Sequence, residues 1–162
     1  MIKKIVIASA LALVASASFA QSAPSVYAGV DVGTVDVDFA GFDESETAAG
    51  VFVGYNFNDN LALEGNYRQA KFDFFKVQQL GLSVIGTLPL SNGFNVYGRL
   101  GYNDIDLKQN VAGGTFSNDF DSGVLYGVGA GYAFTPTISG RVEYQRPNSD
   151  SSVITAGVSF KF

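Results

Sequence analysis

Apolar and polar residues alternate with a period of two along most of the chain beyond residue 25. The pattern is clearest in Val153–Phe162. One face of this segment would carry Ile154, Ala156, Val158, Phe160 and Phe162. Because side chains of a β-strand point alternately to its two faces, the pattern predicts a half-buried strand. About ten residues is also the length that a tilted strand needs to cross a bilayer.

Eight such segments can be recognised by the same period of two. They are Val26–Phe39, Thr47–Phe57, Leu61–Lys71, Phe75–Leu90, Phe94–Ile105, Asp121–Phe134, Thr137–Gln145 and Val153–Phe162. In the first segment the apolar positions change parity near Thr34, which predicts a β-bulge near Gly33.

The connections between the segments alternate in length. Tight turns are expected at Asn58–Asn60, Ser91–Gly93 and Thr135–Pro136. Longer polar loops are expected at Ala40–Glu46, Phe72–Phe74, Asp106–Phe120 and Arg146–Asp150. Short periplasmic turns and longer external loops are typical of outer-membrane barrels. We therefore predict an all-β fold, an eight-stranded antiparallel up-and-down transmembrane β-barrel with both termini periplasmic.

Aromatic residues on the apolar faces fall near the segment ends, as in the two girdles of a barrel in lipid. The short-turn ends carry Tyr55, Phe57, Phe94, Tyr132, Phe134, Phe160 and Phe162. The long-loop ends carry Tyr67, Tyr102 and Tyr144. A soluble eight-stranded barrel is the alternative, but it would turn its charged face to the outside. The charges here share the face opposite the aromatic residues, which favours lipid.

The first residues follow the three-part pattern of a secretory signal. Lys3 and Lys4 precede an apolar run and a small-residue site, with cleavage expected after Ala20 and Ala17 as the competing site. A retained membrane helix is disfavoured because the apolar run is too short. We expect residues 1–20 to be a signal peptide and residues 21–162 to form one barrel domain.

The net charge and the residue types that are missing from the sequence limit the functions that the chain can have. Removing the expected signal takes away two lysines and no acids, so the net charge falls from −5 to −7, which is unsuited to binding nucleic acid. The sequence has no Cys, and it has no His for Ser–His or Asp–His catalysis. A site built from Lys or carboxylates alone stays open as an alternative. We expect no enzymatic activity, no catalytic residue, no cofactor and no metal site.

Acidic residues gather in the predicted loops. Asp36–Gly41 begins like a calcium-binding loop, but Ala40 and Thr47 then stand where an oxygen ligand and a Glu are needed. We interpret these acids as solvated loop residues, with weak divalent-cation bridging to lipopolysaccharide as the other interpretation. The expected partners are outer-membrane lipid and lipopolysaccharide, and we expect a monomer.

Charged residues lie on the predicted inner face at mid-strand. They are Asp31, Glu64, Arg99, Arg141 and Glu143, with Arg68 nearer the outer mouth and Lys161 nearer the periplasmic mouth. The lumen of an eight-stranded barrel is just wide enough for side chains to fill it, so these charges should pair across it. They would form either a structural polar core or a gated, weakly conducting path. Gly127, Gly129 and Gly131 would make room for bulky inward residues such as Phe52 or Tyr97.

Several segments resemble the transmembrane domain of the outer membrane protein A family and its short relatives such as OmpX. They are Val26–Gly33, Leu63–Tyr67, Val96–Gly101 and Arg141–Gln145. The resemblance implies that Glu64 and Arg141 form a salt bridge that blocks the lumen. It places the family's second, partner-switching carboxylate and lysine at Gly131 and Ile85, which carry no charge, so Arg99 or Glu143 would have to substitute.

The same resemblance implies that Phe160 and Phe162 form a C-terminal aromatic signal read by the outer-membrane assembly machinery. Larger relatives carry a periplasmic peptidoglycan-binding domain, which we do not expect after the eighth strand. For a barrel in the outer membrane of a Gram-negative bacterium, we expect a structural, envelope-integrity or adhesin-like surface role through the external loops. The alternative is a small gated pore for ions or small solutes.

Overall fold

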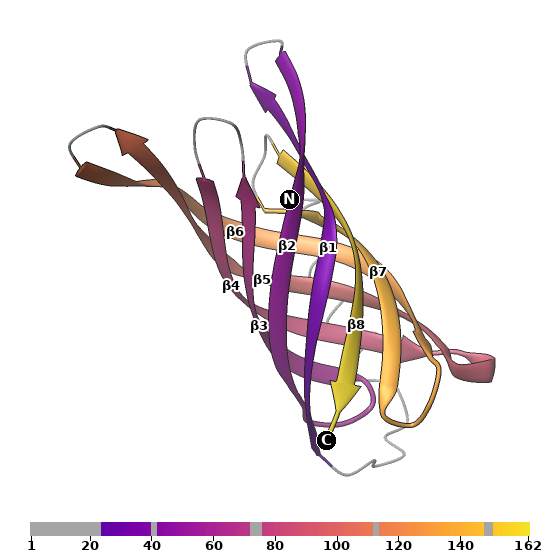
Figure 1. Cartoon of the computed structure of the whole chain (residues 1–162). Helices are drawn as coiled ribbons and strands as arrows, with labels where there is room; N and C mark the ends of the chain where they lie inside the picture. Colours follow the sequence, from indigo (N-terminus) through magenta and orange to yellow (C-terminus); the bar gives the residue numbers. More distant parts are fainter. Residues whose placement is uncertain (1–23, 40–41, 72–75, 112–113, 148–150) are drawn as a thin grey trace, which may run out of the picture.

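The computed structural model describes residues 24–39, 42–71, 76–111, 114–147 and 151–162. For residues 37–39, 42–45, 71, 76, 106–111 and 114–121 within these ranges it describes the backbone alone. Eight strands make up almost all of this part of the chain (Figure 1). They are β1 (Ser25–Phe39), β2 (Phe42–Asn56), β3 (Leu61–Lys71), β4 (Lys76–Pro89), β5 (Phe94–Val111), β6 (Gly114–Ala133), β7 (Ile138–Arg146) and β8 (Ser151–Lys161). None of the described residues belongs to a helix long and apolar enough to cross a membrane.

Each strand pairs antiparallel with the next, and β8 pairs with β1, so the sheet closes into a barrel (Figure 1). This confirms the predicted eight-stranded up-and-down architecture. Closure satisfies the backbone hydrogen bonds of the wall without leaving an open sheet edge, which a structure surrounded by lipid requires. Three tight connections lie at one end of the barrel, which we call the short-turn end. One of them contains the 3₁₀ turn η1 (Ser91–Gly93), where Asn92 and Gly93 adopt positive φ.

The opposite end, which we call the hairpin end, differs from the sequence-based expectation. Loops were predicted at Ala40–Glu46 and Asp106–Phe120, but the strands continue through most of both segments. The β1–β2 pairing runs to Phe39 opposite Phe42, and the β5–β6 pairing runs to Val111 opposite Gly114. Both hairpins project beyond the barrel wall (Figure 1). A two-stranded ribbon buries neither face in a core, so the sequences of Ala40–Glu46 and Asp106–Phe120 lack the alternation that identifies the wall strands.

The other two loops predicted at the hairpin end lie wholly or partly outside the residues that the structure describes. Phe72–Phe74 and residues 148–150 lie outside the described residues, whereas Arg146 belongs to β7 rather than to a loop.

The predicted bulge near Gly33 is wrong. β1 pairs with β2 and with β8 without a register shift on either side of Thr34. Val35 keeps the inward parity, and it is apolar because it lies opposite the buried Val153 of β8. The register shift that the structure does contain lies in the β5–β6 hairpin, between Ile105 and Asp106.

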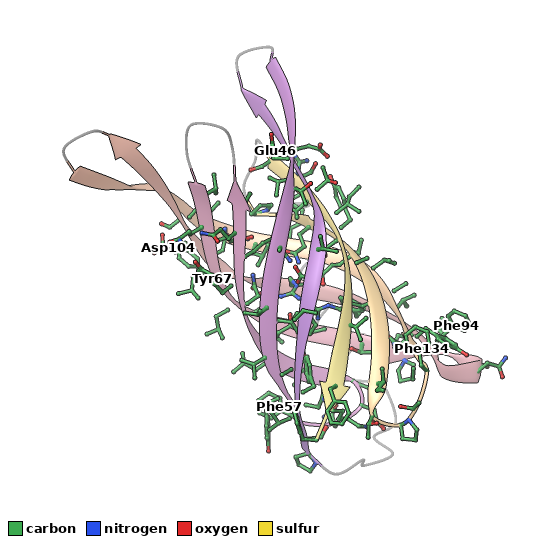
Figure 2. All side chains as sticks on the ribbon, viewed as in Figure 1. Glu46, Phe57, Tyr67, Phe94, Asp104 and Phe134 are labelled. Atoms are coloured by element: carbon green, nitrogen blue, oxygen red, sulfur yellow. The ribbon has the colours of Figure 1, made fainter. Side chains whose placement is uncertain are left out.

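The outer face of the wall is apolar, as predicted. Exposed Val, Leu, Ile, Phe and Tyr side chains cover all eight strands. At the short-turn end aromatic rings contact one another in pairs, with centroids 4.6 Å apart for Phe94 and Tyr132 and 5.1 Å apart for Tyr55 and Phe57. Phe57, Phe94 and Phe134 mark this end in Figure 2, and Tyr67 lies toward the hairpin end. A soluble barrel would present the opposite arrangement.

Inward-facing glycines give the narrow lumen room for large side chains. The Tyr97 ring occupies the space that a Cβ at Gly129 would need, and these two residues are direct cross-strand partners. This confirms the prediction for Tyr97. Phe52 was expected against the glycines of β6, but its ring lies over Gly29 of β1. Bulky residues and glycines therefore alternate between neighbouring strands at the same level, which keeps the interior filled.

Candidate functional site

Six charged side chains meet inside the barrel, and we call them the lumen charge network. They are Asp31 of β1, Glu64 and Arg68 of β3, Arg99 of β5, and Arg141 and Glu143 of β7. All six had been predicted as inward charges from the sequence, five of them at mid-strand and Arg68 nearer the outer mouth, and the structure brings all six together. The network contains three carboxylates and three guanidinium groups, so its formal charge is zero.

Arg99 joins two carboxylates that come from different strands. Its Nη2 donates to Glu64 Oε1, and its Nε donates to Glu143 Oε1, both at 2.5 Å. All three side chains are completely inaccessible to solvent. Because charges removed from water are costly unless they are paired and hydrogen-bonded, these three groups depend on one another.

Arg141 lies close to all three carboxylates of the network. Its Nη1 donates to Glu64 Oε2 at 2.6 Å, while the separations between nitrogen and oxygen are 3.9 Å to Asp31 and 4.0 Å to Glu143. The guanidinium also lies over the Phe52 ring, 3.5 Å from its centroid, which is a cation–π arrangement. The Glu64–Arg141 pair implied by the family resemblance is therefore present, and Arg99 binds the same carboxylate at the same time.

Arg68 completes the network toward the hairpin end. Its Nε and Nη2 donate to the two oxygens of Asp31 at 3.1 and 3.0 Å, which is a two-bond, fork-like pair. Its Nη1 donates to the side-chain oxygens of Gln79 and Gln145. The sequence analysis placed Arg68 on the inward face but near the outer mouth, and therefore left it out of the mid-strand site. Its long side chain reaches Asp31, which position along the strand alone does not show.

Two tyrosines that the sequence analysis did not assign to the site also bind its carboxylates. Tyr27 donates its hydroxyl to Glu64 Oε2, and Tyr97 donates to Glu143 Oε2, each at 2.8 Å. Along their own strands, Tyr27 lies nearer the short-turn end than Asp31, and Tyr97 lies nearer it than Arg99. Each hydroxyl shares its carboxylate oxygen with an arginine, because Arg141 also donates to Glu64 Oε2 and Arg99 also donates to Glu143 Oε2. The tyrosines thus add hydrogen bonds to acceptors that are buried away from water.

The positions of the family's second ion pair are filled differently. Ile85 is buried in an apolar cluster with Ala62 and Tyr97, packed against Tyr27. Gly131 faces the Asn95 side chain. A second partner for Glu64 is therefore supplied by Arg99 on β5 rather than by a residue at Ile85. The arrangement offers buried ion pairs but no activated nucleophile, and the described residues contain no cluster of three or more His, Cys, Asp or Glu side chains placed to hold a metal ion.

The predicted assembly residues lie at the opposite side of the wall. Phe160 and Phe162 both face outward at the short-turn end, with ring centroids 5.1 Å apart. The backbone N–H of Phe162 donates to the carbonyl of Val26 at 2.9 Å, so β8 stays paired with β1 up to this residue. Their role in assembly remains a prediction.

Comparison with known proteins agrees with this geometry. Residues 6–162 match the family model of the outer membrane protein beta-barrel domain. The chain belongs to this outer-membrane barrel family. Outer membrane protein A of Salmonella typhi is 33% identical to it, across 99% of this chain and 55% of the relative, and that of Shigella flexneri is 32% identical, across 99% and 56%.

Among solved structures, Neisserial surface protein A superposes with a TM-score of 0.73 at 20% identity, covering 87% of this chain and all of that one. Ail, the attachment invasion locus protein of Yersinia pestis, superposes with a TM-score of 0.64 at 16% identity, with the same coverage. At these identities the two structures establish the fold alone.

The family places this barrel in the outer membrane of a Gram-negative bacterium, and it is of the outer membrane protein A type. The chain spans about half the length of the curated relatives that it matches. None of the four relatives described above carries the name of an enzyme.

Proposed function

We propose that this protein is a non-enzymatic membrane anchor that presents two β-hairpins for contacts with other molecules at the cell surface. The observation that carries the proposal is the contrast between the two parts of the molecule. The lumen is filled by a neutral, hydrogen-bonded network, whereas the β1–β2 and β5–β6 hairpins extend beyond the wall (Figure 1). Exposed segments carried on a rigid scaffold are where binding residues concentrate.

The orientation follows from the same proposal. The hairpin end would face the cell exterior and the short-turn end the periplasm, which would put the C-terminal strand end on the periplasmic side. The barrel would work as a monomer surrounded by lipid and lipopolysaccharide. Phe160 and Phe162 would be the contact for the assembly machinery.

The chemistry of the hairpin end favours a partner with basic groups. Asp36 and Asp104 are exposed there and Glu46 is partly exposed, with Glu46 and Asp104 labelled in Figure 2. The sequence of the two hairpins adds further acids, including Asp43, Glu44 and Asp119. Ail, which shares the fold, was solved with a heparin analogue. Heparin is strongly anionic, so the acidic hairpins of this chain would repel such a ligand and attract a basic surface.

Binding of purified protein in nanodiscs of uncharged lipid to beads coated with polylysine or with heparin tests this role. Ile105 and Asp121 are direct cross-strand partners, so Asp106–Phe120 can be replaced by a two-residue Asn–Gly turn. We expect binding to polylysine beads at low salt, a large loss on this replacement, and no binding to heparin beads. The same measurement on a protein with a shortened β1–β2 hairpin shows how much that hairpin contributes. If a protein that carries both changes still binds polylysine as the wild type does, the hairpins are not the contact surface.

A small gated pore is the second candidate, and the lumen charge network is the observation that favours it. Glu64 binds two arginines at once, Arg99 and Arg141, and release of either one would change the shape of the blocked region. Conductance of the purified protein in planar bilayers is the test. Reproducible openings that change in the Glu64→Ala variant would support the pore. If the wild-type protein shows no conductance, the pore is excluded.

A further inference from the structure

We propose that the lumen is a one-sided vestibule. Water and small solutes enter it from the short-turn end as far as Arg141, and a ring of apolar residues closes it toward the hairpin end. This ring, rather than the ion pairs, is then the barrier that survives when the lumen charge network is broken. The proposal rests on the lumen and is independent of any contact made by the hairpins.

The ring, which we call the apolar collar, lies directly beyond the network toward the hairpin end. It consists of Ala48 of β2, Ala70 of β3, Ile105 of β5, Leu125 of β6 and Val153 of β8, each between 0% and 7% exposed. On β3 the inward sequence from the network outward is Glu64, Asn66, Arg68 and then Ala70. The polar layer therefore ends at Arg68, and the next inward side chain on that strand is apolar.

Pairing between strands links collar positions in two groups, one on β2 to β4 and one on β8 and β1. Ala48 is the direct partner of Ala70, and Ala70 is the partner of Val77 on β4. Val153 is the partner of Val35 on β1. Cross-strand partners point to the same face of a sheet, so Val77 and Val35 also face the lumen. On seven of the eight strands the first inward residue beyond the polar layer is thus apolar, and β7 is followed by the buried Pro147. The polar neighbours of this ring are Glu46, the partner of Val35 on β2, and Gln79, the partner of Ile105 on β4.

The side of the network nearer the short-turn end is less completely closed. Aromatic and aliphatic side chains from β1 to β5 cover one half of it, namely Tyr27, Phe52, Ala62, Ile85 and Tyr97. Along β7 and β8 the inward residues Ser139, Gly157 and Ser159 are small and partly exposed. Arg141 stands above Ser139 on β7, and its side chain is 12% exposed, whereas the side chains of the other network members are at most 3% exposed.

The physical reason for assigning the barrier to the collar is the cost of dehydration. An ion that leaves water for an apolar constriction loses its hydration without gaining a ligand, and narrow apolar rings in channels block conduction by losing their water. The charge network offers polar partners to a passing ion, so breaking one of its pairs opens a polar path only as far as the collar.

Accessibility of single cysteines tests the vestibule, because the native sequence contains no Cys to interfere. Ser159→Cys would place a thiol in the vestibule, and Ser83→Cys would place one in the network layer, where Ser83 is 1% exposed. Both are the same near-isosteric change on an inward position. We expect a small charged thiol reagent to modify the first about ten times faster or more, since exposure governs thiol reactivity. Equal rates would overturn the vestibule.

Conductance in planar bilayers tests the collar through four proteins, namely the wild type, Arg141→Ala, the collar variant with Leu125→Ser and Val153→Ser, and the combination of the two. We expect no conductance from Arg141→Ala and measurable conductance from the combination. Conductance from Arg141→Ala equal to that of the combination would show that the ion pairs are the barrier and would overturn the proposal. If the collar variants fail to fold, an Arg141→Ala protein that conducts still refutes it, and the cysteine rates stand independently. Failure of either test leaves the bead-binding result of the hairpins unaffected.

Discussion

At the scale of single residues, the two central arginines of the lumen charge network differ in their hydrogen bonds and in their burial. Arg99 makes two short bonds to two carboxylates and is wholly buried. Arg141 makes two hydrogen bonds to Glu64 alone, lies 3.9 and 4.0 Å from Asp31 and Glu143, and keeps some contact with solvent. Removing one partner of a buried pair is costly mainly because it leaves the other charge uncompensated. The two arginines should therefore differ in what their loss does to the protein.

The first prediction compares these two arginines. Arg99→Met leaves Glu143 with the Tyr97 hydroxyl and a distant Arg141, so we expect a loss of about 3–5 kcal/mol in the free energy of unfolding. Arg141→Met leaves Glu64 bound to Arg99 and Tyr27, and Asp31 bound to Arg68, so the expected loss is smaller, about 1–3 kcal/mol. Urea unfolding in lipid vesicles measures both. Lys161→Met, at the exposed end of β8, is the control, and equal losses for both arginines would contradict the asymmetry.

The second prediction concerns the glycines that make room for large residues. A Cβ at Gly129 would overlap the Tyr97 ring, whereas nothing lies within 4 Å of the position of a Cβ at Gly98, the outward-facing neighbour of Tyr97. Gly129→Ala should therefore cost about 1–3 kcal/mol through overpacking. Gly98→Ala should change stability by less than about 1 kcal/mol, and any change should be a gain. The urea-unfolding midpoints of the two variants measure this difference. A Gly129→Ala protein as stable as Gly98→Ala would refute the packing argument.

At the scale of strands, the sequence predicts the wall well because each wall strand separates lipid from a polar lumen. The bounds of β3 agree with the prediction at both ends, and the inward and outward faces of β5 and β7 agree residue for residue wherever they are described. Prediction fails where that contrast ends. Val35 is apolar on the inward face because the collar is apolar, and the alternation rule misread this as a bulge.

The candidate site shows the same limit. The period of two predicted that all six members of the lumen charge network face inward, but it could not predict their pairing. Arg99 reaches both Glu64 and Glu143 because strands β3, β5 and β7 face one another across a narrow lumen, and this depends on the stagger of the closed barrel. The hydroxyls of Tyr27 and Tyr97 escaped notice because an inward tyrosine looks like a packing residue in the sequence.

The third prediction belongs to β8. Phe162 is 73% exposed and contacts the Phe160 ring, so it contributes little to the interior. If the assembly machinery reads this strand, deleting Phe162 should reduce the amount of folded protein in the outer membrane while leaving the unfolding midpoint of refolded protein nearly unchanged. Phe134→Ala, at the same end of the barrel, is the control. Equal accumulation of both variants in cells would count against a recognition role for Phe162.

At the scale of the whole molecule, stability depends on closing the wall between the first strand and the last. β1 and β8 pair over eleven residues, from Tyr27 opposite Lys161 to Val37 opposite Ser151. A barrel with this seam open would expose two rows of unpaired backbone groups to lipid, which costs several kcal/mol for each group. The hairpins have no such role, because their strands pair with each other beyond the wall. The same backbone change should therefore have opposite consequences in the two places.

The fourth prediction uses proline, which removes a backbone donor from a strand and is not tolerated inside a sheet. Val158 lies in the seam, between Val30 of β1 and Gly140 of β7, whereas Val111 lies at the tip of the β5–β6 hairpin. A closed barrel resists detergent until it is boiled, so unboiled wild-type protein should migrate differently from boiled protein on a gel. Val158→Pro should abolish this difference, and Val111→Pro should preserve it. A heat-modifiable Val158→Pro protein would mean that the seam tolerates a break, and that closure contributes less to stability than the pairing of β1 with β8 implies.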